Sequence, residues 1–177
     1  MSTAPVLKDI QRNLAPEFEK VFREHHAFVY RTAYGVTGRV EDADDVVQTV
    51  FLRLLRREFP PDLTRNPRAY LYRAAFNAAV SVLRARRRNA FENVEEVETP
   101  ATPPMPGVDE DTCRELYDAI AELRPTSAQI LILRYVHDYD LVEIAKTLGT
   151  TRGSVAVSLF RSRARLKKKI REMRAKP

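Results

Sequence analysis

The spacing of apolar residues constrains the fold of this chain more than any other feature. They recur every three or four positions along most of its 177 residues, which places them on one face of an α-helix. Strand signals are scarce, since β-branched residues rarely alternate with polar ones and only 5 glycines could close hairpins. We therefore predict an all-α fold.

Glycines and prolines divide the N-terminal half into three predicted helices. The first runs from residue 16 to the glycines at 35 and 38, and the second begins near residue 41. It ends before the prolines at 60 and 61, which cannot continue a helix, so a loop is predicted over residues 59–65. Asn66 and Pro67 suit the start of the third helix, which runs to about Arg88.

An acidic, proline-rich segment then interrupts the periodicity. Its acids are Glu92, Glu95, Glu96, Glu98, Asp109, Glu110 and Asp111, and Pro100, Pro103, Pro104 and Pro106 lie among them. Such a composition is typical of a flexible linker between domains, and about 20 residues of coil span on the order of 25 Å. We predict two small helical domains, over residues 16–88 and 111–177, joined by a linker over residues 89–110. Residues 1–15 are expected to be a flexible N-terminus.

The C-terminal domain carries the pattern of a helix-turn-helix. Asp140 can cap a short helix over residues 141–148, and Gly149 can adopt the left-handed conformation of a tight turn. Val155 on the final helix would pack back against Ile144. The second helix of such a unit enters the major groove of DNA. Taken alone, the pattern also fits an ordinary helical hairpin in a core.

Positive charge is concentrated in the final helix. Its cationic residues after position 160 are Arg161, Arg163, Arg165, Lys167, Lys168, Lys169, Arg171, Arg174 and Lys176. Because this run directly follows the helix-turn-helix pattern, we expect it to neutralise DNA phosphates. The expected base-reading residues are Thr151, Arg152, Ser154, Ser158 and Arg161.

Two further surfaces are predicted in the N-terminal domain. The third helix and the residues before it carry Arg65, Arg68, Arg73, Arg84, Arg86, Arg87 and Arg88, with Tyr70, Tyr72 and Phe76 among them. Arginines beside aromatic rings suit single-stranded nucleic acid, although Phe76 fits a core position better. The second helix displays an acidic and polar face made of Asp42, Asp44, Asp45, Gln48 and Leu52. It is either a solvated face or a protein-contact face.

Several functional classes are disfavoured. No run of about 18 apolar residues or secretion signal is present, so we expect a cytoplasmic protein without membrane insertion. The single cysteine, Cys113, fits a reducing compartment. His25, His26 and His137 lack metal-ligand spacing, and there is no glycine-rich phosphate loop. We therefore expect no enzymatic activity, no cofactor and no metal.

Three segments resemble the bacterial RNA polymerase sigma factors of the extracytoplasmic-function class. Residues 42–53 (DADDVVQTVFLR) are similar to the helix by which these factors hold the polymerase clamp. Residues 66–73 (NPRAYLYR), with Asn77 and the arginines at 84–88, resemble their helix for the −10 promoter element. Residues 131–136 (LILRYV) and 143–149 resemble their helix-turn-helix for the −35 element. The segments occur in the family's order.

The resemblance implies a role for each surface. The face formed by Asp42, Asp44, Asp45, Gln48 and Leu52 would bind core polymerase. The −10 element would be melted and bound by Arg65, Asn66, Arg68, Tyr70, Arg73, Asn77, Arg84 and Arg87, with residues 59–66 as the pocket for a flipped base. The −35 element would be bound as duplex by Thr151, Arg152, Ser154, Ser158, Arg161, Arg163 and Arg165. The expected partners are core polymerase, promoter DNA and, as for many factors of this class, an anti-sigma protein.

This chain departs from the family at informative positions. Phe76 stands where a basic residue is usual, and the family's Leu-Pro turn is here interrupted by Arg124. In the recognition helix, Ala156, Val157 and Ser158 replace the common Lys, Ser and Arg. An unusual preference at the −35 element is therefore expected.

Two other functions remain as alternatives at this point. A dimeric repressor or activator would read a palindrome with the same helix-turn-helix but without polymerase. A helical interaction module would use its basic faces to bind RNA or an acidic protein. Two basic surfaces of different kind, a spacer between them and an acidic face nearby favour the sigma factor.

Overall fold

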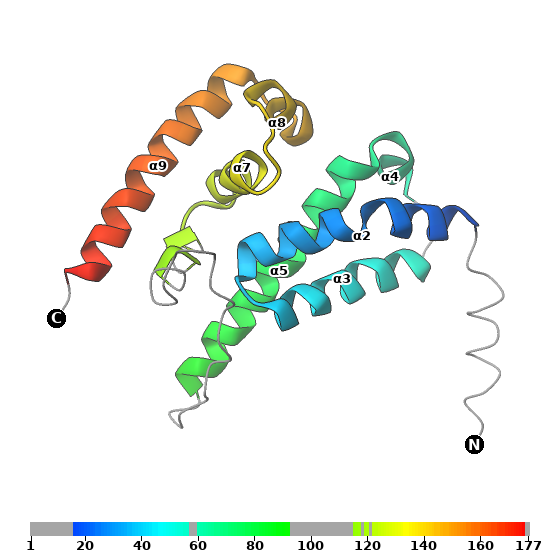
Figure 1. Ribbon diagram of the computed structural model, residues 1–177, viewed down its shortest axis with the longest axis horizontal. Coiled ribbons are helices and arrows are strands. Elements are labelled where there is room, and N and C mark those ends of the chain that lie inside the picture. Colours follow the sequence, from blue (N-terminus) through cyan, green and yellow to red (C-terminus); the bar gives the residue numbers. More distant parts are fainter. Residues whose placement is uncertain (1–15, 57–59, 93–114, 118, 121, 176–177) are drawn as a thin grey trace.

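The computed structural model describes residues 16–56, 60–92, 115–117, 119–120 and 122–175, and regular structure within them is entirely helical (Figure 1). The helices are α2 (Pro16–Thr37), α3 (Val40–Leu55), α4 (Pro61–Arg65), α5 (Pro67–Glu92), α7 (Pro125–Tyr135), α8 (Leu141–Leu148) and α9 (Arg152–Arg174). Short helical stretches also cover residues 115–117 and 119–120. The predicted all-α fold is confirmed.

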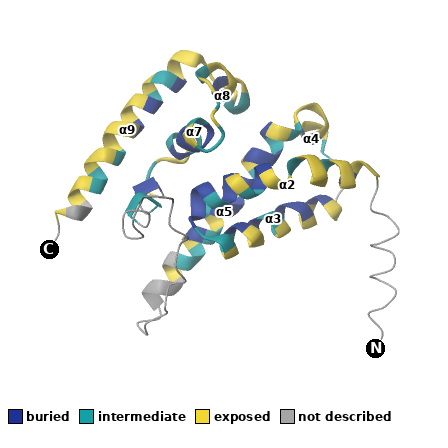
Figure 2. Cartoon of the chain, in the orientation of Figure 1, coloured by how far each residue is buried: buried dark blue, intermediate teal, exposed yellow. Residues whose placement is uncertain are grey.

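Helices α2, α3 and α5 form the core of the N-terminal part, and each contacts the other two. Val29 and Ala33 of α2, Val46 of α3, and Leu71 and Ala75 of α5 are completely buried. Figure 2 shows the buried sides of the three helices turned toward one another, with exposed residues on the outside. The amphipathic spacing in the sequence thus produces a three-helix core.

The predicted loop over residues 59–65 is wrong for its described part, because Pro61–Arg65 form α4. Pro61 occupies the first turn, where its missing N–H costs no hydrogen bond. Leu63 is buried and anchors the turn. The next helix begins as predicted, since the Asn66 Oδ1 atom accepts a hydrogen bond of 3.1 Å from the Ala69 backbone N–H.

The structure describes only part of the predicted linker over residues 89–110. Helix α5 continues to Glu92, so the first four residues of the predicted linker, 89–92, are helical. The rest of the linker up to residue 110 lies outside the described residues, as does the expected flexible N-terminus over residues 1–15.

Helices α7, α8 and α9 form the C-terminal part, and the helix-turn-helix lies at α8 and α9. The Asp140 carboxylate accepts hydrogen bonds from the Val142 and Glu143 backbone N–H groups, and the Glu143 side chain accepts one from the Asp140 N–H. This capping box fixes the start of α8. Gly149 ends α8 with a φ of 68°, a conformation that favours glycine. Both predictions are confirmed.

The two parts share one contiguous core. The Tyr72 hydroxyl of α5 donates a hydrogen bond of 2.7 Å to the Gln129 carbonyl of α7. Gly35 of α2 lies so close to α7 that a Cβ atom there would be 2.9 Å from a methyl carbon of Val136. A side chain at position 35 would therefore push α7 away.

Candidate nucleic-acid and protein interfaces

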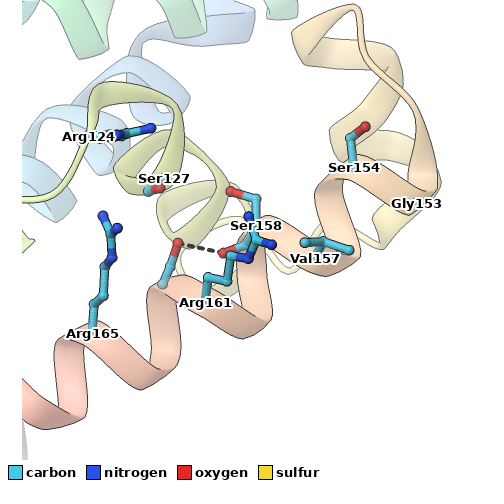
Figure 3. A pocket seen from close by; sticks show the side chains of 9 residues that line it. Arg124, Ser127, Gly153, Ser154, Val157, Ser158, Arg161 and Arg165 are labelled. Carbon is cyan, nitrogen blue, oxygen red and sulfur yellow. Dashed lines mark hydrogen bonds between the residues drawn. The ribbon is translucent and has the colours of Figure 1, made fainter.

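Helix α9 has a buried face and an open polar face. Val155, Leu159 and Ser162 are buried, and their spacing of four and three residues places them on one side of the helix. The open side borders a depression of about 550 Å³ between α9 and the start of α7 (Figure 3). Its lining residues are Arg124, Ser127, Gly153, Ser154, Val157, Ser158, Arg161, Ser162 and Arg165.

The depression is positively charged. Arg124, Arg161 and Arg165 line it, and none of the described residues around it is acidic. Figure 3 shows Arg165 extending from α9 toward the start of α7. The sequence predicts Arg161 and Arg165 as DNA-binding residues but not Arg124. The position of Arg124 could have been recognised, because it directly precedes Pro125, the first residue of α7.

Thr151 and Ser154 form the start of α9. The Thr151 Oγ1 atom accepts a hydrogen bond of 3.2 Å from the Ser154 backbone N–H, and its hydroxyl donates to the Ser154 Oγ atom over 2.9 Å. Both residues and the neighbouring Arg152 are exposed. Thr151 therefore caps the helix and remains accessible to a ligand.

Arg163 does not join the other predicted −35 residues. Its guanidinium carbon lies 5.4 Å from the centre of the Tyr135 ring, and its Nε–H donates a hydrogen bond to the Tyr135 hydroxyl. Two positions along a helix correspond to a rotation of about 200°, so Arg163 faces away from Arg161. The structure therefore separates Arg163 from the depression.

The predicted −10 residues on α5 form one exposed stripe. Tyr70, Arg73, Asn77 and Arg84 follow one another at intervals of three, four and seven residues, which keeps them on one face, and Asn66 directly precedes the helix. Four of them are exposed and Tyr70 is half-buried. Arg65 is exposed at the end of α4, and Arg87 lies on α5 with its side chain outside the described part.

Arg68 lies on another side of α5. Its guanidinium carbon is 4.8 Å from the Phe28 ring centre and 5.5 Å from that of Tyr139. A cation over two aromatic rings is held by their negative faces. Arg68 thus bridges α2 and the residues before α8, and the structure does not bring it together with the stripe.

The aromatic residues of α5 divide between core and surface. Tyr72 is completely buried and Phe76 nearly so, and burial raises the pKa of the Tyr72 hydroxyl well above its ordinary value. The interpretation of Phe76 as a core residue is confirmed. Tyr72 is also a core residue, so only Tyr70 of the three can offer its ring to an unpaired base.

Most of the acidic and polar face of α3 is exposed. Asp44, Asp45 and Gln48 are exposed, and the side chain of Leu52 is 47% exposed. Asp42 differs, because its carboxylate accepts a hydrogen bond of 2.8 Å from Arg86 of α5. A single exposed leucine is common on protein surfaces, so this face fits both a solvated surface and a protein contact.

His137 is half-buried between the two parts of the molecule. The Thr32 hydroxyl donates to the Phe28 carbonyl over 2.9 Å, so it accepts the 2.8 Å hydrogen bond from His137 Nε2–H. The Nδ1 atom is buried with no hydrogen-bond partner among the described residues. Burial, and then the charges of Arg31 and Arg68, lowers the pKa of His137 from 6.5 to about 4.

The described residues form neither a candidate metal site nor a helix that could cross a bilayer. They contain no group of three or more His, Cys, Asp and Glu side chains that could hold a metal ion. None of their helices combines the length and apolar character required to cross a bilayer. Cys113 lies outside the described residues.

Comparison with known proteins identifies related chains. Two family models match, sigma-70 region 2 over residues 21–89 and sigma-70 region 4 over residues 113–166. An RNA polymerase sigma-E factor of Streptomyces antibioticus is 30% identical, over 87% of this chain and 84% of the relative. The ECF RNA polymerase sigma factor SigW of Bacillus subtilis is 21% identical, over 94% and 96%.

Solved structures show the same fold. The sigma factor RpoE of Bartonella quintana, in complex with the anti-sigma factor NepR, superposes with a TM-score of 0.57 and 19% identity. The match covers 88% of this chain and 97% of that one.

Proposed function

The chain belongs to the extracytoplasmic-function (ECF) class of RNA polymerase sigma factors, and from this premise we propose which surfaces engage polymerase and promoter. Helix α9 and the basic depression beside it bind the −35 element as duplex. The exposed stripe on α5 binds the −10 element as a melted strand. The face of α3 formed by Asp44, Asp45, Gln48 and Leu52 binds core polymerase.

The alignment of four predicted residues along one exposed face of α5 supports this proposal best. Tyr70 supplies a ring on which a base can stack, while Arg73 and Arg84 supply charge for the backbone. The side-chain amides of Asn66 and Asn77 can donate hydrogen bonds to a base edge or accept hydrogen bonds from it. This combination suits an unpaired strand, whereas the serines and arginines of α9 suit a duplex groove.

The proposal extends to the organisation of the whole chain. Residues 16–88 would form the polymerase- and −10-binding domain, residues 89–110 the linker and residues 111–177 the −35-binding domain. The chain would act in the cytoplasm, where polymerase is, and would itself catalyse no reaction and need no cofactor. Opening the duplex costs a few kcal/mol per unstacked base, and binding of the displaced strand would offset that cost.

Regulation by an anti-sigma protein is a further part of the proposal. It is supported by the fold shared with RpoE of Bartonella quintana, which was solved in complex with an anti-sigma factor. CnrH, which shares the fold with a TM-score of 0.57, was likewise solved in complex with the cytosolic domain of CnrY. Such a partner would prevent the chain from binding polymerase.

Transcription in vitro tests the central proposal. Core polymerase is incubated with genomic fragments in the presence and absence of the chain, and transcript starts are mapped. We expect starts that require the chain and that share a −10 and a −35 sequence. A chain that neither binds core polymerase nor changes the mapped starts would contradict the proposal.

Two charge reversals sharpen the test on α3. Asp45→Lys should weaken the association with core polymerase without unfolding the chain, because Asp45 is exposed on the proposed contact face. Glu24→Lys is the matched control, since Glu24 is an exposed acid on α2. Affinity capture of polymerase at equal protein levels distinguishes them, and equal capture by both variants would exclude the α3 face.

A further inference from the structure

An apolar side chain stands at the centre of the open face of α9. Val157 is two residues from Val155 and five from Ser162, both buried. At about 100° per residue, these separations turn Val157 roughly 140–200° away from them. Its side chain is 50% exposed and lines the basic depression (Figure 3). Val157 therefore points toward whatever α9 binds.

Folding gives no reason for a valine at this position. A β-branched residue loses rotamer freedom in a helix and is a weaker helix former than Arg, Lys, Gln or Glu. At half exposure it also buries little apolar surface against the protein. Three residues that line the depression with Val157, namely Ser154, Ser158 and Arg161, are polar, and the exposed Phe160 lies outside this lining. A valine among them is more easily explained by a ligand than by stability.

The surface beside Val157 leaves room for close approach. Gly153 lies one helical turn before it, and a Cβ atom added at Gly153 would have no described atom outside the helix within 4 Å. The missing side chain lets a base edge or sugar approach the helix backbone at this point. Val157 can then contact a group at the floor of a groove.

We propose that Val157 selects a thymine in the −35 element by packing against its C5-methyl group. Thymine is the only DNA base with a methyl group at the major-groove edge. Arg161 is suited to guanine and the two serines to any base, so Val157 would add a preference that its neighbours cannot supply. This inference rests on the proposed role of α9 in reading −35 duplex.

Deoxyuridine substitution tests the contact, since deoxyuridine lacks only the methyl group and pairs like thymine. Holoenzyme made from core polymerase and the full chain is bound to a promoter identified by transcription in vitro. Each thymine of the −35 element is then replaced in turn. At one position we expect binding to weaken about fourfold, the factor that corresponds to burying one methyl group.

Val157→Ala connects the effect to this side chain. The variant should bind the thymine promoter about as weakly as the wild type binds the deoxyuridine promoter. Replacing the thymine by deoxyuridine should not weaken DNA binding by this variant any further, because the methyl group no longer has a partner on the protein. Val142→Ala is the matched control: Val142 is an exposed valine on α8, and its variant should keep the wild-type sensitivity.

Two results would overturn the inference. If no thymine of the −35 element is sensitive to loss of its methyl group, or if Val157→Ala remains as sensitive as the wild type, Val157 does not read thymine. The proposed function would survive either result, since promoter binding itself is intact. A wild-type holoenzyme that shows no dependence on any −35 sequence would overturn both.

Discussion

Helices α5 and α9 are both long and basic, but they are packed very differently. Helix α5 packs against α2, α3, α4 and α8 and donates a hydrogen bond to α7, whereas α9 packs mainly against α7 and α8. Tyr72 and Phe76 of α5 are buried, while Val157 and Phe160 of α9 are 50% and 75% exposed. A helix enclosed by the core can offer a ligand only a narrow stripe. A helix at the edge can lie in a groove.

The same comparison shows that charge in a sequence overstates charge at a site. On α5, Arg68 lies over two aromatic rings and Arg86 pairs with Asp42. On α9, Arg163 is held by Tyr135, while Arg161 and Arg165 line the depression. Arginines with an aromatic or acidic neighbour are engaged within the fold, and the remaining ones make up the surface that we propose binds nucleic acid.

The largest expected effect is a difference in stability between alanine variants of two phenylalanines, one from each helix. Phe76→Ala should lower the free energy of unfolding by about 3–5 kcal/mol, because it opens a cavity in the core. Phe160→Ala should change it by less than about 0.5 kcal/mol, because that ring is exposed. Chemical denaturation of both variants measures the difference. Equal losses would contradict the distinction between the helices.

The contact between the two parts should depend on pH through His137. Its pKa is about 4 in the folded chain and about 6.5 in the unfolded chain, so the unfolded state binds more protons between these values. The stability contributed by the neutral ring is present above pH 6.5 and is lost as the pH falls toward 4. The physical reason is that a proton on Nδ1 would be buried without a described acceptor, near Arg31 and Arg68.

A His137→Phe variant isolates this effect from the titration of carboxylates. It keeps an aromatic ring against Phe28, whose centre lies 4.4 Å from that of His137. Thermal unfolding of both proteins between pH 7 and pH 4 should show a steeper loss for the wild type. Parallel pH profiles would mean that His137 is not the titrating group.

A smaller effect is expected at the start of the helix-turn-helix. Asp140→Ala removes the acceptor for two backbone N–H groups and should cost about 1 kcal/mol of stability. Asp140→Asn is the matched control, since an asparagine oxygen can still cap the helix and should recover most of the loss. Denaturation midpoints at pH 7 check both. Equal destabilisation by the two variants would show that the cap does not stabilise α8.

The smallest effect distinguishes two arginines of α9 by the salt dependence of DNA binding. Arg161→Ala should reduce the slope of log affinity against log salt by about 0.9 on −35 duplex, if one phosphate contact is lost. Arg163→Ala should leave that slope unchanged, because its guanidinium lies on Tyr135. Holoenzyme binding to −35 duplex at several salt concentrations measures both slopes. If Arg163→Ala lowered the slope and Arg161→Ala did not, Arg163 would be the phosphate contact.

Much of the fold follows from local signals. The breaks at Gly38 and Gly149, the cap at Asp140 and the start at Asn66 are decided by residues within one turn of each position. Such signals act over a few residues and are therefore visible in the sequence. Helix α4 is the exception, because the sequence predicted a loop there, whereas Pro61–Arg65 form a helix in which Leu63 is buried.

The order of the helices, the amphipathic faces and the excess of positive charge can be predicted from the sequence, because they depend on neighbours along the chain. Packing in three dimensions sets which side chains remain available. It placed Tyr72 in the core, turned Arg68 and Arg163 toward aromatic rings, and added Arg124 to the surface beside Arg161. These outcomes depend on contacts between residues far apart in sequence, and spacing along one helix does not encode them.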